Sequence, residues 1–215
     1  MLEVRDLCAW HGAAQALFGV SLTVGPGELV VLQGLNGAGK STLLQAIMGM
    51  GPRTKGVVRY QNKSILGWPS HRRARFGLGY VPEDRRLFGS LSVRDNLRIA
   101  ARSESGRAGG LALREAQVLE LFPALRSMLD RSAAHMSGGE QQMLAIARTL
   151  MTGPSLLLLD EPCEGIAPVL VESIRDALLA LKGTGLAMLV AEQNGVLAER
   201  ADRVITLRAQ TALTL

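Results

Sequence analysis

The sequence predicts an α/β fold in which helices cover both faces of a parallel or mixed sheet. Three observations lead to this prediction. Short apolar runs alternate with helix-like stretches along most of the 215 residues. A glycine-rich loop at 34–39 joins a continuous apolar run to a helix-like stretch. Helix-like stretches fill most of residues 88–136, which we therefore predict to be a mostly helical insert.

The amino-terminal part is rich in strand-like runs separated by turns. Leu29–Gln33 is continuous and rich in β-branched residues, which is typical of a buried strand. Turn signals at 25–28 and 51–52 bound the unit that it opens. We expect strands at Leu2–Leu7, Val20–Val24, Leu29–Gln33, Val57–Tyr60 and Leu78–Pro82, and a helix at Lys40–Met48.

The insert and the carboxy-terminal part contain most of the predicted helices. Ser103–Gly110 is rich in Ser and Gly and is predicted to be a flexible link between two helices of the insert. After the insert, strands and helices alternate again. We expect helices at Val93–Ala101, Leu113–Met128, Glu140–Met151, Val169–Leu181 and Val196–Ala201, and strands at Ser155–Leu159, Leu186–Ala191 and Arg203–Leu207.

Composition excludes several classes of protein. Apolar residues make up 47% of the chain and charged residues 20%, which are ordinary globular proportions. No apolar run approaches the ~18 residues that a membrane span needs, and the charged start does not resemble a signal peptide. The two cysteines, Cys8 and Cys163, are too few for a disulfide framework. The net charge is +5, but its densest cluster, 71–75, has no aromatic residues for stacking on bases, so we expect no nucleic-acid partner.

Residues 34–41 match the phosphate-binding P-loop pattern. Glycines let consecutive backbone N–H groups turn toward an anion, and the following helix start adds partial positive charge. We expect Lys40 to reach the β- and γ-phosphates of a bound nucleotide, Ser41 to hold Mg²⁺ and Thr42 to contact an inner phosphate. The alternative is a glycine-rich turn that binds nothing. The predicted nucleotide-binding residues of this loop are Gly34, Asn36, Gly37, Ala38, Gly39, Lys40, Ser41 and Thr42.

Two carboxylates follow the most hydrophobic strand-like run of the chain, at 155–159. Asp160 is placed to orient Mg²⁺ at the end of a strand parallel to the one that precedes the P-loop. Glu161 lies just beyond the strand, where it is expected to polarise the attacking water. The alternative is that both are solvated loop acids before Pro162.

A third motif, Ser137–Gln141, opens a predicted helix. Together with the P-loop and the two carboxylates it strongly resembles the motifs of the ATP-binding-cassette (ABC) ATPases, and the resemblance covers nearly the whole chain. The hydroxyl and the N–H groups of this motif would form a second anion site at a helix start, and an ordinary helix cap is the alternative. The resemblance implies that this signature segment meets the γ-phosphate held by a partner subunit. Its residues are Ser137, Gly138, Gly139, Glu140 and Gln141.

The resemblance implies one cassette domain over residues 1–215. It consists of a P-loop NTPase core at about 1–87 and 137–215 with a mixed sheet, an N-terminal antiparallel β subdomain, and a helical subdomain at about 88–136. A dimer is implied that closes on ATP with Mg²⁺ and opens on hydrolysis. That motion would drive two membrane-spanning permease subunits, which places the chain peripherally at the cytoplasmic face of the inner membrane.

Several positions depart from the general pattern of the family. Glu83 stands where a glutamine usually contacts the metal, and Gln193 stands at the switch position usually held by histidine. Ala167 lacks the usual cross-dimer carboxylate. The resemblance implies an aromatic residue that stacks on adenine, and its position corresponds to His11, with Trp10 as one alternative and packing of both on the first strand as another. The predicted metal ligands are therefore Ser41, Glu83 and Asp160, and the predicted catalytic residues are Glu161 and Gln193.

Short sequence motifs on these loops resemble those of the second ATP-binding subunit of branched-chain amino-acid importers. They lie at 81–88, 164–168 and 192–194. Urea and short-amide importers are the alternative, and a regulatory cassette that binds ATP without turnover is another. The resemblance implies a homodimer or a heterodimer with a sister ATPase, and indirectly a periplasmic substrate-binding protein. The transported molecule is not specified, because substrate choice lies on other subunits.

Overall fold

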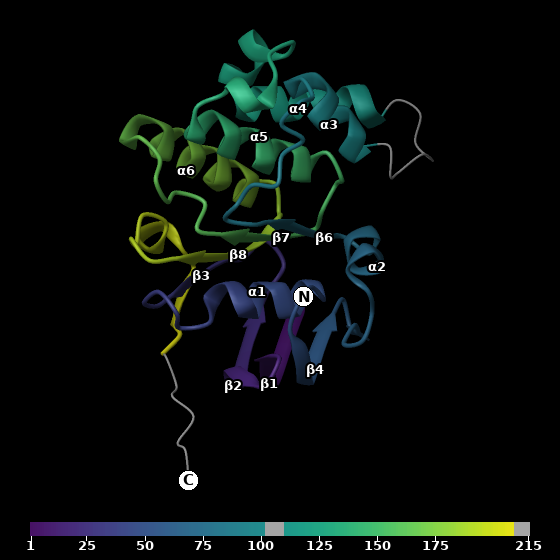
Figure 1. The fold of residues 1–215 in the computed structure, drawn as a ribbon, viewed down its shortest axis with the longest axis vertical. Coiled ribbons are helices and arrows are strands. Elements are labelled where there is room, and N and C mark those ends of the chain that lie inside the picture. The colour runs from purple at the N-terminus through teal and green to yellow at the C-terminus, as the bar shows by residue number, and fades with distance from the viewer. Residues whose placement is uncertain (102–109, 209–215) are drawn as a thin grey trace.

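The computed structural model describes residues 1–101 and 110–208, and these form two sheets with helices around them (Figure 1). One sheet has four strands in the order β2-β1-β4-β5, and the other has five in the order β6-β7-β8-β3-β9. All pairings in the second sheet are parallel. The predicted α/β class is therefore confirmed, with the antiparallel and parallel strands separated into two sheets.

The antiparallel sheet is built from strands longer than the sequence predicted. Its strands are β1 Leu2–His11, β2 Ala14–Val24, β4 Arg53–Tyr60 and β5 Lys63–Ser64. The pairing of β1 with β4 shifts register between Arg5 and Cys8. There Asp6 and Gly56 both adopt positive φ, and a Cβ on Gly56 would lie 2.5 Å from the Asp6 carbonyl oxygen. Only glycine fits at this irregularity, which interrupts the alternation from which the strand ends were predicted.

The parallel sheet separates two apolar layers. It consists of β3 Leu29–Gln33, β6 Leu78–Val81, β7 Leu156–Asp160, β8 Ala187–Glu192 and β9 Arg203–Thr206. In β3, Val30 and Leu32 pack with the first helix, whereas Leu29 and Val31 pack on the opposite face. Side chains of successive strand residues point to opposite faces, so a continuous apolar run fits a sheet covered on both sides.

Helices cover both faces of the parallel sheet. In the view of Figure 1, α1 lies below it, and α5 and α6 lie above it with α3 and α4 beyond them. The α-helices are α1 Lys40–Met48, α2 Ser70–Arg75, α3 Val93–Ala101, α4 Gly110–Leu121, α5 Gly138–Leu150 and α6 Pro168–Gly183. Short 3₁₀ turns lie at Pro123–Met128, Ala133–His135 and Ala198–Arg200.

Two helix predictions are wrong in detail, and one short helix was not predicted. The helix expected at Leu113–Met128 ends at Leu121, because Pro123 cannot continue it and the chain turns into 3₁₀ geometry. The helix expected at Val196–Ala201 is only the 3₁₀ turn. The short α2 was not predicted, since it is held by tertiary contacts: the buried guanidinium of Arg73 donates to the carbonyls of Ala46 and Ile47 at the end of α1. The expected link at Ser103–Gly110 lies almost wholly outside the described residues.

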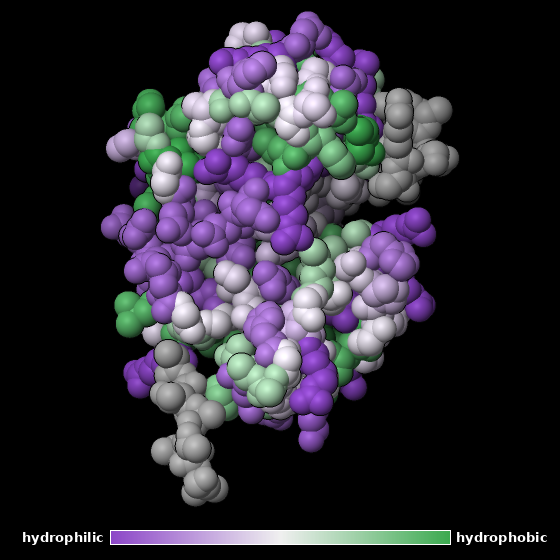
Figure 2. Space-filling model, in the orientation of Figure 1, coloured by the Kyte–Doolittle hydropathy of each residue, from purple (hydrophilic) through white to green (hydrophobic). Residues whose placement is uncertain are grey.

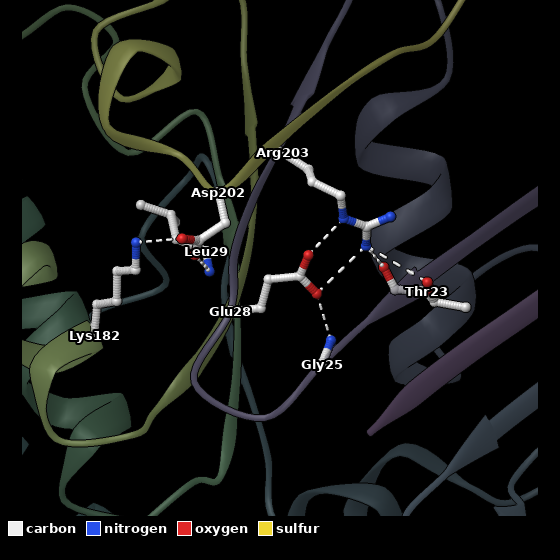
Figure 3. A network of polar contacts seen from close by, with 7 residues as sticks. All are labelled: Thr23, Gly25, Glu28, Leu29, Lys182, Asp202 and Arg203. Carbon is white, nitrogen blue, oxygen red and sulfur yellow. Dashed lines mark hydrogen bonds and ion pairs between the residues drawn. The ribbon is translucent and has the colours of Figure 1, made fainter.

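A polar network fixes the edge strand β9 (Figure 3). The guanidinium of Arg203 donates to both carboxylate oxygens of Glu28 and to the Thr23 carbonyl. The carboxylate of Asp202 accepts hydrogen bonds from the N–H of Leu29 at 2.8 Å and from the ammonium of Lys182 at 2.6 Å. The network therefore ties β9 to the start of β3, and through Lys182 to the end of α6.

On the face shown in Figure 2, hydrophilic residues are widespread and apolar patches are scattered among them. Within residues 1–101 and 110–208, no helix has the length and hydropathy of a bilayer span. A groove of about 260 Å³ opens between α2 and α3. Its lining includes Met48, Met50, Ala74, Leu78, Pro82 and Ala100.

Candidate active site

The carboxyl ends of the parallel strands border a cavity of about 330 Å³. Ligands of open α/β sheets bind at this edge, because the loops leaving the strands converge there. The cavity brings together the P-loop with the loops that follow β6 and β7. It is lined by Ala16, Asn36, Gly37, Gly39, Lys40, Ser41, Thr42, Glu83, Glu161 and Glu164.

The P-loop makes an open helix start. Gly39 precedes α1 with φ 95°, and Gly37 has φ 80°. A Cβ on Gly39 would lie 2.8 Å from a Leu17 methyl group and 3.1 Å from the Ala16 carbonyl oxygen, so a larger residue does not fit. Because glycine has no side chain to cap the helix, the N–H groups of the first turn stay available to an anion.

Lys40 is folded into the loop beside the catalytic candidate. Its side chain is 5% exposed, and its ammonium donates to the Gly34 carbonyl at 2.7 Å. The ammonium also forms an ion pair at 3.0 Å with Glu161, whose side chain is 8% exposed. Lys40 can swing to a phosphate only by giving up this pair.

Asp160 is held by hydroxyl groups on both carboxylate oxygens. Ser41 donates to Oδ1 at 2.9 Å and Tyr80 donates to Oδ2 at 3.2 Å. Burial raises the pKa of Asp160 and the two hydroxyl bonds lower it, while the charges of Glu83 and Glu161 raise it further, so the net shift is upward. A cation beside this carboxylate would offset that shift.

The donor set at Asp160 fits Mg²⁺. Magnesium takes hard oxygen ligands, with one or two carboxylates from the protein and the rest from phosphates and water. Asp160 and Ser41 supply two such oxygens side by side, and Glu83 lines the same cavity. Among the described residues there is no cluster of three or more His, Cys, Asp or Glu side chains that would hold a metal alone. Oxygens of phosphate and water would share such an ion with Asp160 and Ser41.

Glu161 connects the cavity to the loop after β8. It adopts φ 46°, and its N–H donates to the Ala191 carbonyl at 2.9 Å. Its second carboxylate oxygen accepts the backbone N–H of Gln193 at 3.1 Å. The loop itself is anchored by Glu192, which is 2% exposed and accepts the Leu197 N–H at 3.0 Å. Burial raises the pKa of Glu192. The backbone of Gln193 thus lies against Glu161, but Gln193 does not line this cavity and instead borders a neighbouring one with Gly34.

His11 and Trp10 take different places at the end of β1. The imidazole Nε2 of His11 lies 3.2 Å from the hydroxyl of Thr42 in the first turn of α1. Trp10 is half-buried, and the guanidinium carbon of Arg53 lies over its ring at 5.0 Å from the ring centroid. The structure therefore places His11, and not Trp10, beside the P-loop helix.

The signature segment is not part of this cavity. Ser137 caps α5 in a capping box: its N–H donates to Glu140 at 2.7 Å, and its hydroxyl accepts the Glu140 N–H. A Cβ on Gly139 would lie 2.3 Å from a Leu170 methyl group, so α5 meets α6 closely there. Gln141 donates to the Ala133 carbonyl at 3.0 Å. The segment stands on the face of the sheet opposite α1, apart from the P-loop of its own chain.

Tyr80 was missed by the sequence reasoning as a site residue. Burial and the charge of Asp160 raise the pKa of its hydroxyl, so it remains a donor at neutral pH. Two signals were available: Tyr80 lies in the predicted strand before Glu83, and aromatic hydroxyl groups need a partner when they are buried. The order of the strands in the sheet could not be deduced from the sequence, so the contact of Tyr80 with Asp160 was not predicted.

Comparison with known proteins identifies the family of this chain. The model of the family described as ABC transporter matches residues 17–164, which is more than half of the chain. The chain belongs to the ABC transporter family. It is therefore an ATPase, as the three motifs predicted, and ATP is the nucleotide of its P-loop.

Relatives of this cassette serve different transport systems. It is 41% identical to the high-affinity branched-chain amino acid transport ATP-binding protein BraG of Pseudomonas aeruginosa, covering 96% of this chain and 88% of that one. It is 40% identical to the lipoprotein-releasing system ATP-binding protein LolD 1 of Rhodospirillum rubrum, covering 95% and 92%. A crystal structure described as the ADP conformation of an ATP-binding cassette of an ABC transporter superimposes with a TM-score of 0.82 at 27% identity, covering 96% of this chain and 87% of that one.

Proposed function

We propose that this cassette is the ATP-hydrolysing subunit of an importer for branched-chain or related amino acids. The observation that carries the hydrolytic part is that Lys40, Ser41 and Glu161 line one cavity, where Ser41 also donates a hydrogen bond to Asp160. The substrate class rests on the likeness to BraG, together with the loop tags around Glu83 and Gln193.

In the proposed reaction, the arrival of ATP separates the ion pair at the cavity. The phosphates attract Lys40 away from Glu161, and the free carboxylate is then placed to accept a proton from the attacking water. The amide side chain of Gln193 donates to the γ-phosphate from the neighbouring loop. Asp160 and Ser41 would hold Mg²⁺, which supplies compensation for charge that develops on the phosphates. Gly34–Thr42 bind the phosphates and His11 stacks on the base.

The proposed working unit is a dimer, as a homodimer or with a sister ATPase. Ser137 and the N–H groups of Gly138 and Gly139 form the start of α5, away from their own P-loop, and we expect the phosphate that they contact to come from another subunit. Each nucleotide then lies between the P-loop of one chain and the signature segment of the other. ATP stabilises the closed pair, and hydrolysis releases it.

The cassette is proposed to act peripherally at the cytoplasmic face of the membrane, against two permease subunits. The apolar groove between α2 and α3 supports this arrangement, because it lies where the helical insert meets the parallel sheet. A periplasmic binding protein would deliver the substrate to those permeases and would not touch this chain.

Uptake by cells that lack this chain tests the proposal. Labelled leucine, urea and a neutral polar amino acid are compared with the wild-type chain or the Glu161→Gln variant restored. We expect the wild type, and not the variant, to restore leucine uptake. Restoration of urea uptake alone would move the substrate to the other importer class. If none of the three is restored while ATPase activity persists, the amino-acid assignment is wrong, and lipoprotein release becomes the next function to assay because of the likeness to LolD 1.

A further inference from the structure

The loop between β6 and α3 contacts both the nucleotide cavity and the signature helix α5. Glu83 lines the cavity. Two residues later, Arg85 extends its guanidinium over the start of α5, which is on the other side of the parallel sheet from the P-loop helix. A single short segment therefore spans the two anion-facing parts of the chain.

Arg85 bonds side chains at the start of α5. Its Nε donates to the Gln142 amide oxygen at 3.1 Å, and its NH1 donates to the Gln141 amide oxygen at 3.3 Å. The guanidinium lies 3.4 Å from the place that a Cβ on Gly138 would take. Arg85 therefore lies directly against the start of α5, which Ser137 caps.

The Gln142 amide depends on this contact. Gln142 is 2% exposed, and its side-chain nitrogen has no hydrogen-bond partner within residues 1–101 and 110–208. Burying an amide is costly unless it is hydrogen-bonded. The guanidinium of Arg85 also carries positive charge to the positive end of α5, which is unfavourable by itself. The arrangement is explained if the two amide oxygens serve to hold Arg85 in place.

The backbone of the same loop is strained and held from α5 as well. Arg85 and Arg86 have φ 59° and 46°, in the left-handed region that residues with a Cβ avoid. Such strain persists where surrounding contacts impose it. Here the guanidinium of Arg148, on α5, donates to the Arg86 carbonyl at 2.8 Å and to the Arg85 carbonyl at 3.2 Å. Four hydrogen bonds thus join this short loop to α5.

We propose that Arg85 is a positioning residue that couples the Glu83 side of the nucleotide cavity to the signature segment of the same chain. The proposal rests on the proposed function, since the signature segment acts there on the partner's nucleotide. A displacement at Glu83 when ATP binds is then transmitted to Gln141 and Gln142, and the signature segment of a loaded chain is aligned for closure. Arg85 itself touches no reacting atom.

Arg86 supplies a matched control. It is the adjacent arginine of the same strained turn, but its side chain is exposed and pairs with Asp84. Arg86→Ala removes the same charge from the loop and leaves both backbone bonds to Arg148 possible. A difference between Arg85→Ala and Arg86→Ala therefore reports the contact with α5.

The experiment measures kcat and the equilibrium Kd for ATP of the full chain, with thermal unfolding of each variant. We expect Arg85→Ala to lower kcat by about tenfold, the effect of losing hydrogen bonds from a charged donor, while Kd stays within about twofold. Arg86→Ala should leave both within about twofold. Arg85→Lys should recover part of kcat. Gln141→Ala should lower kcat, and the double variant Arg85→Ala/Gln141→Ala should be no slower than Arg85→Ala alone.

Two results would overturn the proposal while leaving the proposed function intact. One is an Arg85→Ala kcat equal to that of Arg86→Ala. The other is a parallel loss of kcat, ATP affinity and thermal stability without recovery by lysine, which is what a purely structural arginine would give. If Arg85→Ala fails to fold, Arg85→Lys and Gln141→Ala decide the question by the same split of kcat against Kd. A wild-type chain without ATP turnover would refute the proposed function and the inference with it.

Discussion

Because Lys40 and Glu161 form an ion pair in this structure, replacing Glu161 should change the affinity for ATP as well as the rate of hydrolysis. Glu161→Gln removes the negative charge that faces the Lys40 ammonium at 3.0 Å, with side chains that are 5% and 8% exposed. The Coulomb attraction of unit charges at that distance is about 5.5 kcal/mol at an effective dielectric constant of 20. Much of it is offset by the cost of desolvating the two ions. If one quarter remains, about 1.4 kcal/mol favours the empty site, and its loss tightens ATP binding about tenfold.

The same variant should lose hydrolysis, since an amide cannot accept the proton of the attacking water. Loss of a general base lowers kcat by about 10²- to 10⁴-fold. Equilibrium ATP binding and single-turnover hydrolysis measure the two effects separately. Glu164→Gln is the matched control: this exposed carboxylate lines the same cavity, and we expect it to leave turnover within about twofold. The reasoning is refuted if Glu161→Gln hydrolyses ATP at a near-normal rate, or if it binds ATP more weakly than the wild type.

Three further predictions follow from other contacts. Tyr80→Phe removes the hydroxyl that donates to Asp160, so the Mg²⁺ concentration for half-maximal ATPase activity should rise about tenfold; an unchanged Mg²⁺ requirement would exclude the positioning role. Gln193→Ala should slow hydrolysis more than it weakens ATP binding, because its side chain is proposed to contact only the γ-phosphate; equal losses in binding and rate would contradict that role. The Lys182 ion pair and the Leu29 N–H lower the pKa of Asp202, so its contribution to stability is present above the unfolded pKa of about 3.9 and is lost as pH falls through the lower folded value. Thermal unfolding from pH 6 to pH 3 should therefore show wild type and Asp202→Asn converging at low pH, and a constant difference would show that another contact is responsible.

The fold was largely predictable because its dominant signals are local. Residues 29–32 and Leu156–Leu159 are continuous apolar runs, and both form strands buried on both faces. The features that were missed depend on residues distant in the sequence. The helix α2 is held by Arg73 on the carbonyls of α1, and the β1 irregularity needs Gly56 on another strand. Pro123 was a readable break that the apolar pattern of its neighbours concealed.

Part of the cavity lining was predictable from the sequence, since Lys40, Ser41 and Glu161 border it as their motifs suggested, but the contacts between these side chains were not predictable. Motif spacing assembled Lys40, Asp160 and Glu161, because loops after parallel strands meet at one edge. The ion pair of Lys40 with Glu161, the hydroxyl of Tyr80 on Asp160 and the reach of Arg85 to α5 all depend on side-chain directions across strands. A single sequence does not specify which strands are neighbours.

A crystal structure of the Glu161→Gln variant with Mg²⁺ and ATP would show whether the nucleotide displaces Lys40 and lies between two chains. We predict that the Lys40 ammonium has left residue 161 for the β- and γ-phosphates, and that Asp160 and Ser41 face the metal. We also predict that the signature serine of a second chain reaches the same γ-phosphate. A nucleotide bound with Lys40 still against residue 161, or a site closed by no second chain, would contradict these predictions.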